Sequence, residues 1–181
     1  MSYELRKGTL IDENTIRLEL PLTPSRNQVD RWTYTRSLRE IQAHKASQFV
    51  AVKATLYQAL GKFERWADHV VFAAIRCSNS RRRVDVSNII GGLKQSEDCV
   101  VRCRLILDDD PGHVTWGPCE DRAGGPSRWG TLPGPCTHLL IVRTRTHYAQ
   151  IMPVADAINR ILQWMADTAP PAPPPVYADL A

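Results

Sequence analysis

The seven-residue run from His69 to Ile75, HVVFAAI, constrains the fold more than any other stretch of the chain. A short, almost wholly apolar run is typical of a strand in the middle of a sheet. The segment 137–144, which contains LLIV, predicts a second strand. Residues 15–20 alternate apolar and polar side chains, as a half-buried strand does, and residues 114–116 begin a further strand. These segments predict a sheet.

Helical segments separate the expected strands. Residues 33–60 are rich in helix formers without Pro or Gly, and Gly61 supplies a stop, so one long helix is expected there. A second helix is expected with Ser87 or Asn88 as its N-cap, and an amphipathic helix over 153–167. We therefore predict a small α/β (α+β) domain in which helices pack on a mixed sheet.

Length and composition define the expected boundaries of this domain. At 181 residues the chain is most simply one domain with a single hydrophobic core. We expect an N-terminal extension over 1–14, and the domain itself over 15–167. Within the domain, residues 117–135 form a Gly/Pro-rich insert, and a Pro-rich disordered tail follows over 168–181.

Cysteine content favours an intracellular protein, and the modest basic charge is compatible with nucleic-acid binding. The formal net charge is +4, and basic residues gather over 31–53 and 76–83. The five cysteines are an odd number and no secretory signal is recognisable, which favours the reducing cytoplasm. No apolar run approaches the roughly 20 residues that cross a bilayer, so no membrane association is expected. Cys99 and Cys103 would share a helix face, where a core role is favoured over metal binding.

The segment RRRVDVSN, residues 81–88, carries the strongest chemical signal together with Asp108 to Asp110. Planar guanidinium groups bind phosphate in a bidentate manner and stay charged. Mg²⁺ is held by one or two carboxylates plus phosphate oxygens, which Asp85 and one of the later aspartates would supply. Taken separately, the arginines are equally well explained as a solvated turn and the aspartates as a polar turn. Their order in one chain favours a metal-dependent site for phosphodiester hydrolysis.

Several segments in the same order resemble the RusA family of Holliday junction resolvases, especially its phage-type members. The segments are LELP at 18–21, PSRN at 24–27 with Trp32, RRVDVSN at 82–88, GGLK at 91–94 with Asp98, and LDDDPGHV at 107–114. The most specific part is the basic run followed by an element similar to the family's Asp-x-Asp-Asn. The resemblance covers roughly residues 18–116.

The resemblance implies a homodimeric, structure-selective endodeoxyribonuclease that makes paired nicks in four-way DNA junctions with Mg²⁺, or Mn²⁺ as a substitute. It implies that Asp85 and Asp109 bind the metal, with Asp108 in support, and that Lys94 is the catalytic lysine. The residues expected against DNA are Arg81, Arg82, Arg83, Asn88, Arg26, Asn27, Trp32 and Arg36. For Trp32, stacking on unpaired bases and packing in the core are equal alternatives. A phage or prophage source in the bacterial cytoplasm is expected, with no small-molecule substrate.

One position departs from the family pattern. Ser87 stands where the family has its second aspartate, two residues after the first. A hydroxyl is a neutral and weaker ligand for Mg²⁺, so metal affinity should fall. Three outcomes stay open: one of Asp98, Asp108 and Asp110 compensates, a water held by the serine fills the position, or the protein is a catalytically impaired junction binder. The serine is equally well explained as a helix N-cap.

The spacing between the acids limits how they can meet. A helix from Asn88 to Arg104 would separate its ends by about 25 Å, too far for Asp85 and Asp109 to share a metal. Either a shorter helix begins near Gly92 and the chain returns in extended form, or a second subunit contributes a group across a two-fold interface. The paired glycines indicate a late helix start or a close backbone approach.

Overall fold

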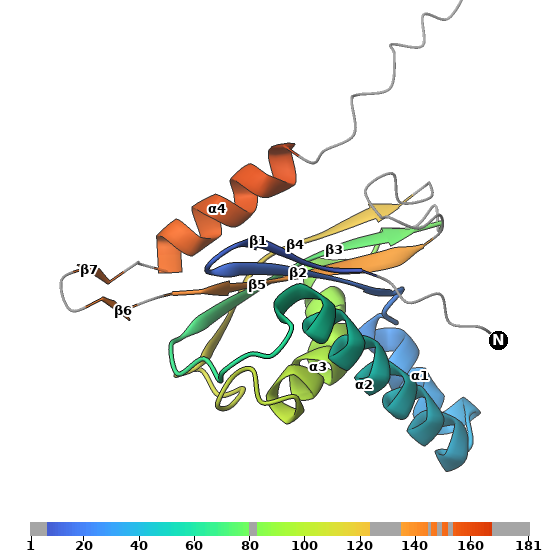
Figure 1. The fold of residues 1–181 in the computed structure, drawn as a ribbon. Helices are drawn as coiled ribbons and strands as arrows, with labels where there is room; N and C mark the ends of the chain where they lie inside the picture. Colours follow the sequence, from blue (N-terminus) through green and yellow to red (C-terminus); the bar gives the residue numbers. More distant parts are fainter. Residues whose placement is uncertain are drawn as a thin grey trace, which may run out of the picture.

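A five-stranded mixed sheet forms the centre of the fold in a computed structural model of the chain (Figure 1). The structure describes residues 7–79, 83–123, 135–144, 146–147, 150–151 and 154–167. The strands, in the spatial order β1-β2-β5-β3-β4, are β1 (Gly8–Asp12), β2 (Thr15–Pro21), β5 (Cys136–Arg143), β3 (Val70–Ser78) and β4 (Val114–Ala123). β3 and β4 run parallel, whereas the other neighbouring pairs of this sheet run antiparallel. A separate hairpin consists of β6 (Thr146–His147) and β7 (Gln150–Ile151).

Helices cover both faces of the sheet, which confirms the predicted α+β class (Figure 1). They are α1 (Arg26–Thr35), α2 (Leu38–Leu60), α3 (Val86–Arg102) and α4 (Val154–Asp167). Val70 and Phe72 of β3 belong to the core under α2 and α3, whereas Val71 and Ile75 belong to the core under α4. Because neighbours along a strand point to opposite faces, β3 supplies both cores, and every one of its residues is buried. The predicted central strand is confirmed.

Two helices replace the single helix expected over 33–60. α1 follows Ser25 and α2 follows Ser37, and each serine donates its backbone N–H to a side chain three residues on. Gln28 Oε1 accepts at 2.8 Å in the first case and Glu40 Oε2 at 2.8 Å in the second. Such capping boxes satisfy N–H groups at a helix start, so a new helix begins within a run of helix formers. The PSRN segment at 24–27 accordingly leads into α1, with Ser25 as its N-cap.

The structure differs from the expected domain boundaries at the N-terminus and at the Gly/Pro-rich insert, because both contain strands of the sheet. Residues 8–12, which the sequence assigned to an extension, form the edge strand β1 and pair with β2. Gly8 is needed there because a Cβ at this position would lie 1.7 Å from the carbonyl oxygen of Thr55 in α2. Residues 117–123 of the expected insert belong to β4. Residues 124–134 and the Pro-rich tail lie outside the described part of the chain.

Helix α3 forms the crossover between the parallel strands β3 and β4. It begins at Val86 and continues through both glycines to Arg102. A Cβ at Gly92 would lie 1.9 Å from the carbonyl oxygen of Pro24, just ahead of α1. The glycines therefore permit a close backbone approach, and the expectation of a shorter helix that begins near Gly92 is wrong.

Replacing Gly92 with alanine should weaken the contact between α3 and the start of α1. Because the added methyl group meets a backbone carbonyl, we expect Gly92→Ala to lower the free energy of unfolding by about 1–3 kcal/mol. Gly91→Ala is the matched control, because its methyl group would meet the side chain of Arg26, which is 67% exposed and can move. Urea unfolding measures both variants. Equal losses for the two would contradict this packing.

Candidate functional site

A polar cleft lies where the N-terminal ends of α1 and α3 come together. Its volume is about 540 Å³, within the range typical of ligand-binding sites. It is lined by Ser25, Asn27, Gln28, Arg31, Arg76, Arg83, Val84, Asp85 and Asn88. Two segments far apart in the sequence, 25–31 and 83–88, therefore meet at one place.

Asp85 is the N-cap of α3, a role that the sequence assigned to Ser87 or Asn88. Its carboxylate accepts hydrogen bonds from Ser87 Oγ at 2.6 Å, from Asn88 Nδ2 at 2.6 Å and from the Asn88 backbone N–H at 3.0 Å. These hydrogen bonds lower the pKa of Asp85 to about 2, and the bond from the Ser87 hydroxyl has the largest effect. Asp85 is thus an exposed and ionised carboxylate on the cleft.

Two helix ends make the cleft attractive to anions. The N-terminus of a helix carries partial positive charge and N–H groups that have no partner within the helix. Phosphate and carboxylate groups bind at such ends. Here α1 and α3 both begin at the cleft, and the exposed side chains of Arg31 and Arg83 add full positive charges. The arrangement suits a phosphate group.

A buried ion pair holds both helix starts against the sheet. Arg76 of β3 and Asp121 of β4 are partners in the parallel ladder, and Arg76 Nη1 lies 3.1 Å from Asp121 Oδ1. Their side chains are only 5% and 1% exposed. Arg76 Nε donates to the carbonyl oxygen of Thr23, ahead of α1, at 3.2 Å. Asp121 Oδ2 accepts the N–H of Val84, ahead of α3, at 2.7 Å.

Sequence reasoning missed the ion pair. The sequence assigned Arg76 to a basic cluster and Asp121 to the Gly/Pro-rich insert. A charged residue that directly follows an apolar central strand requires a buried partner, because an unpaired charge in the core is costly. That signal predicts a partner for Arg76, but only the register of β3 against β4 shows which acid it is.

Removing one member of the pair should leave a buried charge without its counter-ion. We expect Asp121→Ala to lower the free energy of unfolding by about 3–5 kcal/mol. The double variant Arg76→Met, Asp121→Leu is the control, because it replaces both charges with apolar side chains and should recover most of the loss. Denaturant unfolding tests both variants. A double variant as unstable as the single one would contradict the role of the ion pair.

Lys94 and Asp109 meet at a second place, away from the cleft. Lys94 Nζ forms an ion pair with Asp109, and it lies 3.7 Å from Glu97 and 3.5 Å from Asp98. Burial opposes the charge on Lys94, yet its contacts with Asp109 and the other two acids outweigh burial and raise the pKa of the lysine. The hydrogen bond from Lys94 in turn lowers the pKa of Asp109. Both groups are therefore charged at neutral pH.

Asp108 and Asp110 shape the turn after α3. Asp108 Oδ1 accepts the backbone N–H of Asp109 at 2.8 Å. Asp110 accepts the N–H of Gly112 at 2.6 Å and lies 2.9 Å from His113 Nδ1. These bonds form the polar turn that the sequence allowed for these acids, and the supporting metal role of Asp108 stays a prediction.

The continuous helix keeps Asp85 and Asp109 apart within one chain. Lys94, the partner of Asp109, is nine residues beyond Asp85 in the sequence, or about 13 Å along the helix axis. The turn after α3 lies where β3 and β4 begin, at the opposite end of the sheet from their arrowheads (Figure 1). Asp85 therefore lies at the start of α3 and Asp109 pairs with a lysine about two and a half turns further on, and a metal shared by the two aspartates stays a prediction.

The remaining residues expected against DNA divide between the cleft and α1. Asn27, Arg83 and Asn88 line the cleft, whereas Arg81 and Arg82 lie outside the described residues. In α1, the guanidinium of Arg26 lies 3.7 Å from Asp30 at the surface.

Trp32 of α1 contacts the cationic side chain of Arg36 and the aromatic ring of His44, whose pKa is lowered by burial and by Arg36. The guanidinium of Arg36 lies over its ring at 4.0 Å, and the ring of His44 meets it edge-on at 4.7 Å. Trp32 is half-buried, so it is not a core residue, and its ring is not fully exposed for stacking on a base. Cation–π contact instead makes it part of a basic surface.

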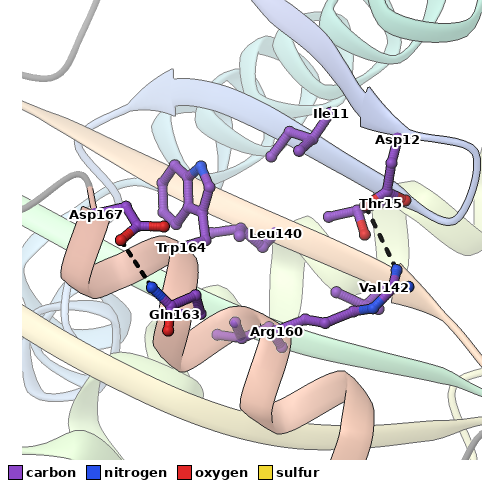
Figure 2. A pocket seen from close by; sticks show the side chains of 10 residues that line it. Ile11, Asp12, Thr15, Leu140, Val142, Arg160, Gln163, Trp164 and Asp167 are labelled. Carbon is purple, nitrogen blue, oxygen red and sulfur yellow. Dashed lines mark hydrogen bonds and ion pairs between the residues drawn. The ribbon is translucent and has the colours of Figure 1, made fainter.

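A smaller, mostly apolar pocket of about 240 Å³ lies beside α4 (Figure 2). Its walls include Leu140 of β5 and Trp164 of α4. Of its charged residues, Asp12 and Arg160 lie 3.5 Å apart and pair with each other, and Asp167 accepts a hydrogen bond from Gln163 at 2.8 Å. The cleft between α1 and α3 is therefore the stronger candidate site, because its ionised groups face a space that a ligand can enter.

Comparisons with known proteins do not identify the chain. No protein-family model matches the sequence, and no curated protein matches it. In the described part of the chain, no helix is both long enough and apolar enough to cross a membrane. Function must therefore be inferred from the cleft and from the sequence motifs that form it.

Proposed function

We propose that the protein binds branched DNA in the cleft between α1 and α3 and cuts the phosphodiester backbone in a Mg²⁺-dependent reaction. The observation that carries this proposal is the convergence of two helix N-termini, the exposed Arg31 and Arg83, and the ionised Asp85 on one cleft. The activity is that of a structure-selective endodeoxyribonuclease, which the resemblance to RusA resolvases also implies.

Phosphate binding would begin at the helix ends. A DNA phosphate in the cleft would accept hydrogen bonds from the first N–H groups of α1 and α3 and from the guanidinium of Arg83. Asp85 would repel a bare phosphate at the same place. A divalent cation between the two anions removes this repulsion, so the cleft favours phosphate and metal together.

The α1–α2 arm, defined here as residues 26–45, extends the basic surface of the cleft, with which it shares Asn27, Gln28 and Arg31. It projects away from the sheet (Figure 1), and α1 has no buried residue. The arm carries five basic and two acidic side chains. A branched duplex is wide enough to contact both the cleft and the arm, and the positive charge of both would attract its backbone.

The cleft supplies one carboxylate, the smallest number that typically holds Mg²⁺. Mg²⁺ is typically held by one or two carboxylates together with phosphate oxygens and water. Asp85 is the carboxylate that the cleft supplies, with Ser87 and Asn88 hydrogen-bonded beside it. The bound metal would polarise the phosphoryl oxygen and lower the pKa of a water. The carboxylate of Asp85 would hold the cation against the phosphate.

A homodimer would allow Asp109 to contribute to the cleft. α3 keeps Asp109 with Lys94 and away from Asp85 of the same chain. A second copy related by a two-fold axis would present its own Asp109 from the opposite end of its sheet. The same symmetry matches a four-way junction, which is itself nearly two-fold.

A second candidate function is junction binding without cutting. Ser87 supplies a hydroxyl that donates to Asp85, where the RusA pattern has another carboxylate. Asp109 is neutralised by Lys94. Both observations lower the expected metal affinity, while the helix ends and arginines that would bind phosphate stay in place.

Nicking of a synthetic four-way junction separates the two candidates. For the nuclease, the unmodified protein should nick the junction with Mg²⁺ or Mn²⁺. Asp85→Asn should abolish nicking and retain binding, because a neutral amide holds the cation poorly. Glu64→Gln is the matched control, since Glu64 is an exposed carboxylate outside the cleft, and it should leave nicking unchanged.

Binding measured in the same samples decides the remaining outcomes. Tight junction binding without nicking in either cation would contradict the nuclease and favour the second candidate. Arg83→Ala should weaken binding and reduce the salt dependence by about one phosphate contact, whereas Lys62→Ala, at an exposed site outside the cleft, should not. Equal affinity for junction and linear duplex, unaffected by Arg83→Ala, would contradict both candidates.

A further inference from the structure

Three metal-binding side chains meet on the face of the sheet that α4 covers. They are Cys77 of β3 and Cys136 and His138 of β5, and their ligand atoms all lie within 4.8 Å of one another. Cys136 Sγ and His138 Nε2 are 3.4 Å apart. All three residues are buried, with an exposed fraction of 2% for Cys77 and 0% for the other two.

Sheet register brings these three residues together. Cys77 and Cys136 are direct partners in the antiparallel ladder of β3 and β5, so their side chains leave the same face. His138 shares that face because side chains alternate along a strand. The chain neighbours Arg76 and Thr137 point to the other face, where they bond to the segment ahead of α1. The cluster is therefore separate from the cleft.

We propose that Cys77, Cys136 and His138 bind a zinc ion. Thiolate sulfur and imidazole nitrogen are preferred zinc ligands, and a tetrahedral site with Zn–S of about 2.3 Å and Zn–N of about 2.0–2.1 Å places sulfur and nitrogen about 3.6 Å apart. The separation of 3.4 Å between Cys136 and His138 agrees with this value. Two sulfurs in such a site lie about 3.8 Å apart, so shifts of about 1 Å are enough to bring all three ligands onto the ion.

Burial decides which ion the cluster suits. The surrounding core contains Leu140, Ile161 and Met165, and a net charge there is costly. Two thiolates and a neutral imidazole with Zn²⁺ give a neutral site, whereas Cu⁺ would leave a negative charge. Each thiol loses its proton as its Zn–S bond forms, so binding releases two protons to solvent.

The zinc ion joins the end of β3 to the start of β5 beneath α4, and a water or another donor completes its four tetrahedral ligands. β3 ends at Ser78, directly after Cys77, and the chain then leads to Asp85 on the cleft. The ion therefore stabilises the strand end from which the cleft segment departs.

Metal content and a cobalt spectrum test the zinc site. The full chain produced in zinc-supplemented cells should contain one zinc ion per chain. Refolding the full chain with Co²⁺ under reducing conditions should produce thiolate-to-cobalt charge-transfer absorption and the visible bands of tetrahedral cobalt. The thermal unfolding midpoint should rise with zinc concentration, because an ion that binds only the folded state stabilises it.

Cysteine variants locate the ion. Cys136→Ser removes a ligand and should lower zinc affinity by more than about 100-fold. Cys99→Ser is the matched control, because Cys99 is equally buried but lies in α3, outside the cluster. If Cys136→Ser does not fold, the intensity of the charge-transfer band of the unmodified protein still counts the bound thiolates.

Four results would overturn the zinc site. They are a protein that contains no zinc, a cobalt-refolded protein without a thiolate band, equal zinc affinity in the Cys136→Ser and Cys99→Ser variants, and a disulfide between Cys77 and Cys136 in protein from a reducing cytoplasm.

Discussion

The buried ion pair between Arg76 and Asp121 is the interaction on which the candidate site depends. Charges that are 5% and 1% exposed must be paired to be tolerated in the sheet. The pair uses its remaining hydrogen-bonding groups on Thr23 and Val84, the residues that lead into α1 and α3. It therefore fixes where both helices begin and holds their N-terminal ends on one cleft. The ion pair that stabilises the sheet therefore also positions the helix ends that attract phosphate.

Local signals predicted most of the strands and helices. The apolar run up to Ile75 predicted the central strand, and the amphipathic segment over 153–167 predicted α4. The break between α1 and α2 was missed because it depends on one capping serine, Ser37, inside a run of helix formers. Strand β1 was missed because an edge strand over 8–12 is defined by its pairing with β2 rather than by its own composition.

The candidate site was predicted in part, and the limit is geometric. Motifs placed Arg83, Asp85 and Asn88 on one functional surface, and these residues line the cleft. The same motifs placed Asp109 with Asp85, which requires a break in α3. Gly92 instead allows α3 to pass close to the backbone ahead of α1 and to continue, so Asp85 caps the start of the helix while Asp109 pairs with Lys94 at its middle. The distance between residues on either side of a helical segment depends on whether the helix is continuous, and sequence spacing alone does not show this.

Hydrogen exchange of the full chain, with and without a synthetic four-way junction, tests the central claim most directly because it locates bound DNA on the protein. We predict slower exchange at the amides that begin α1 and α3, residues 26–28 and 86–88, and little change in α4. Protection confined to α4, or no protection at saturating DNA, would contradict the assignment of the cleft as the DNA site.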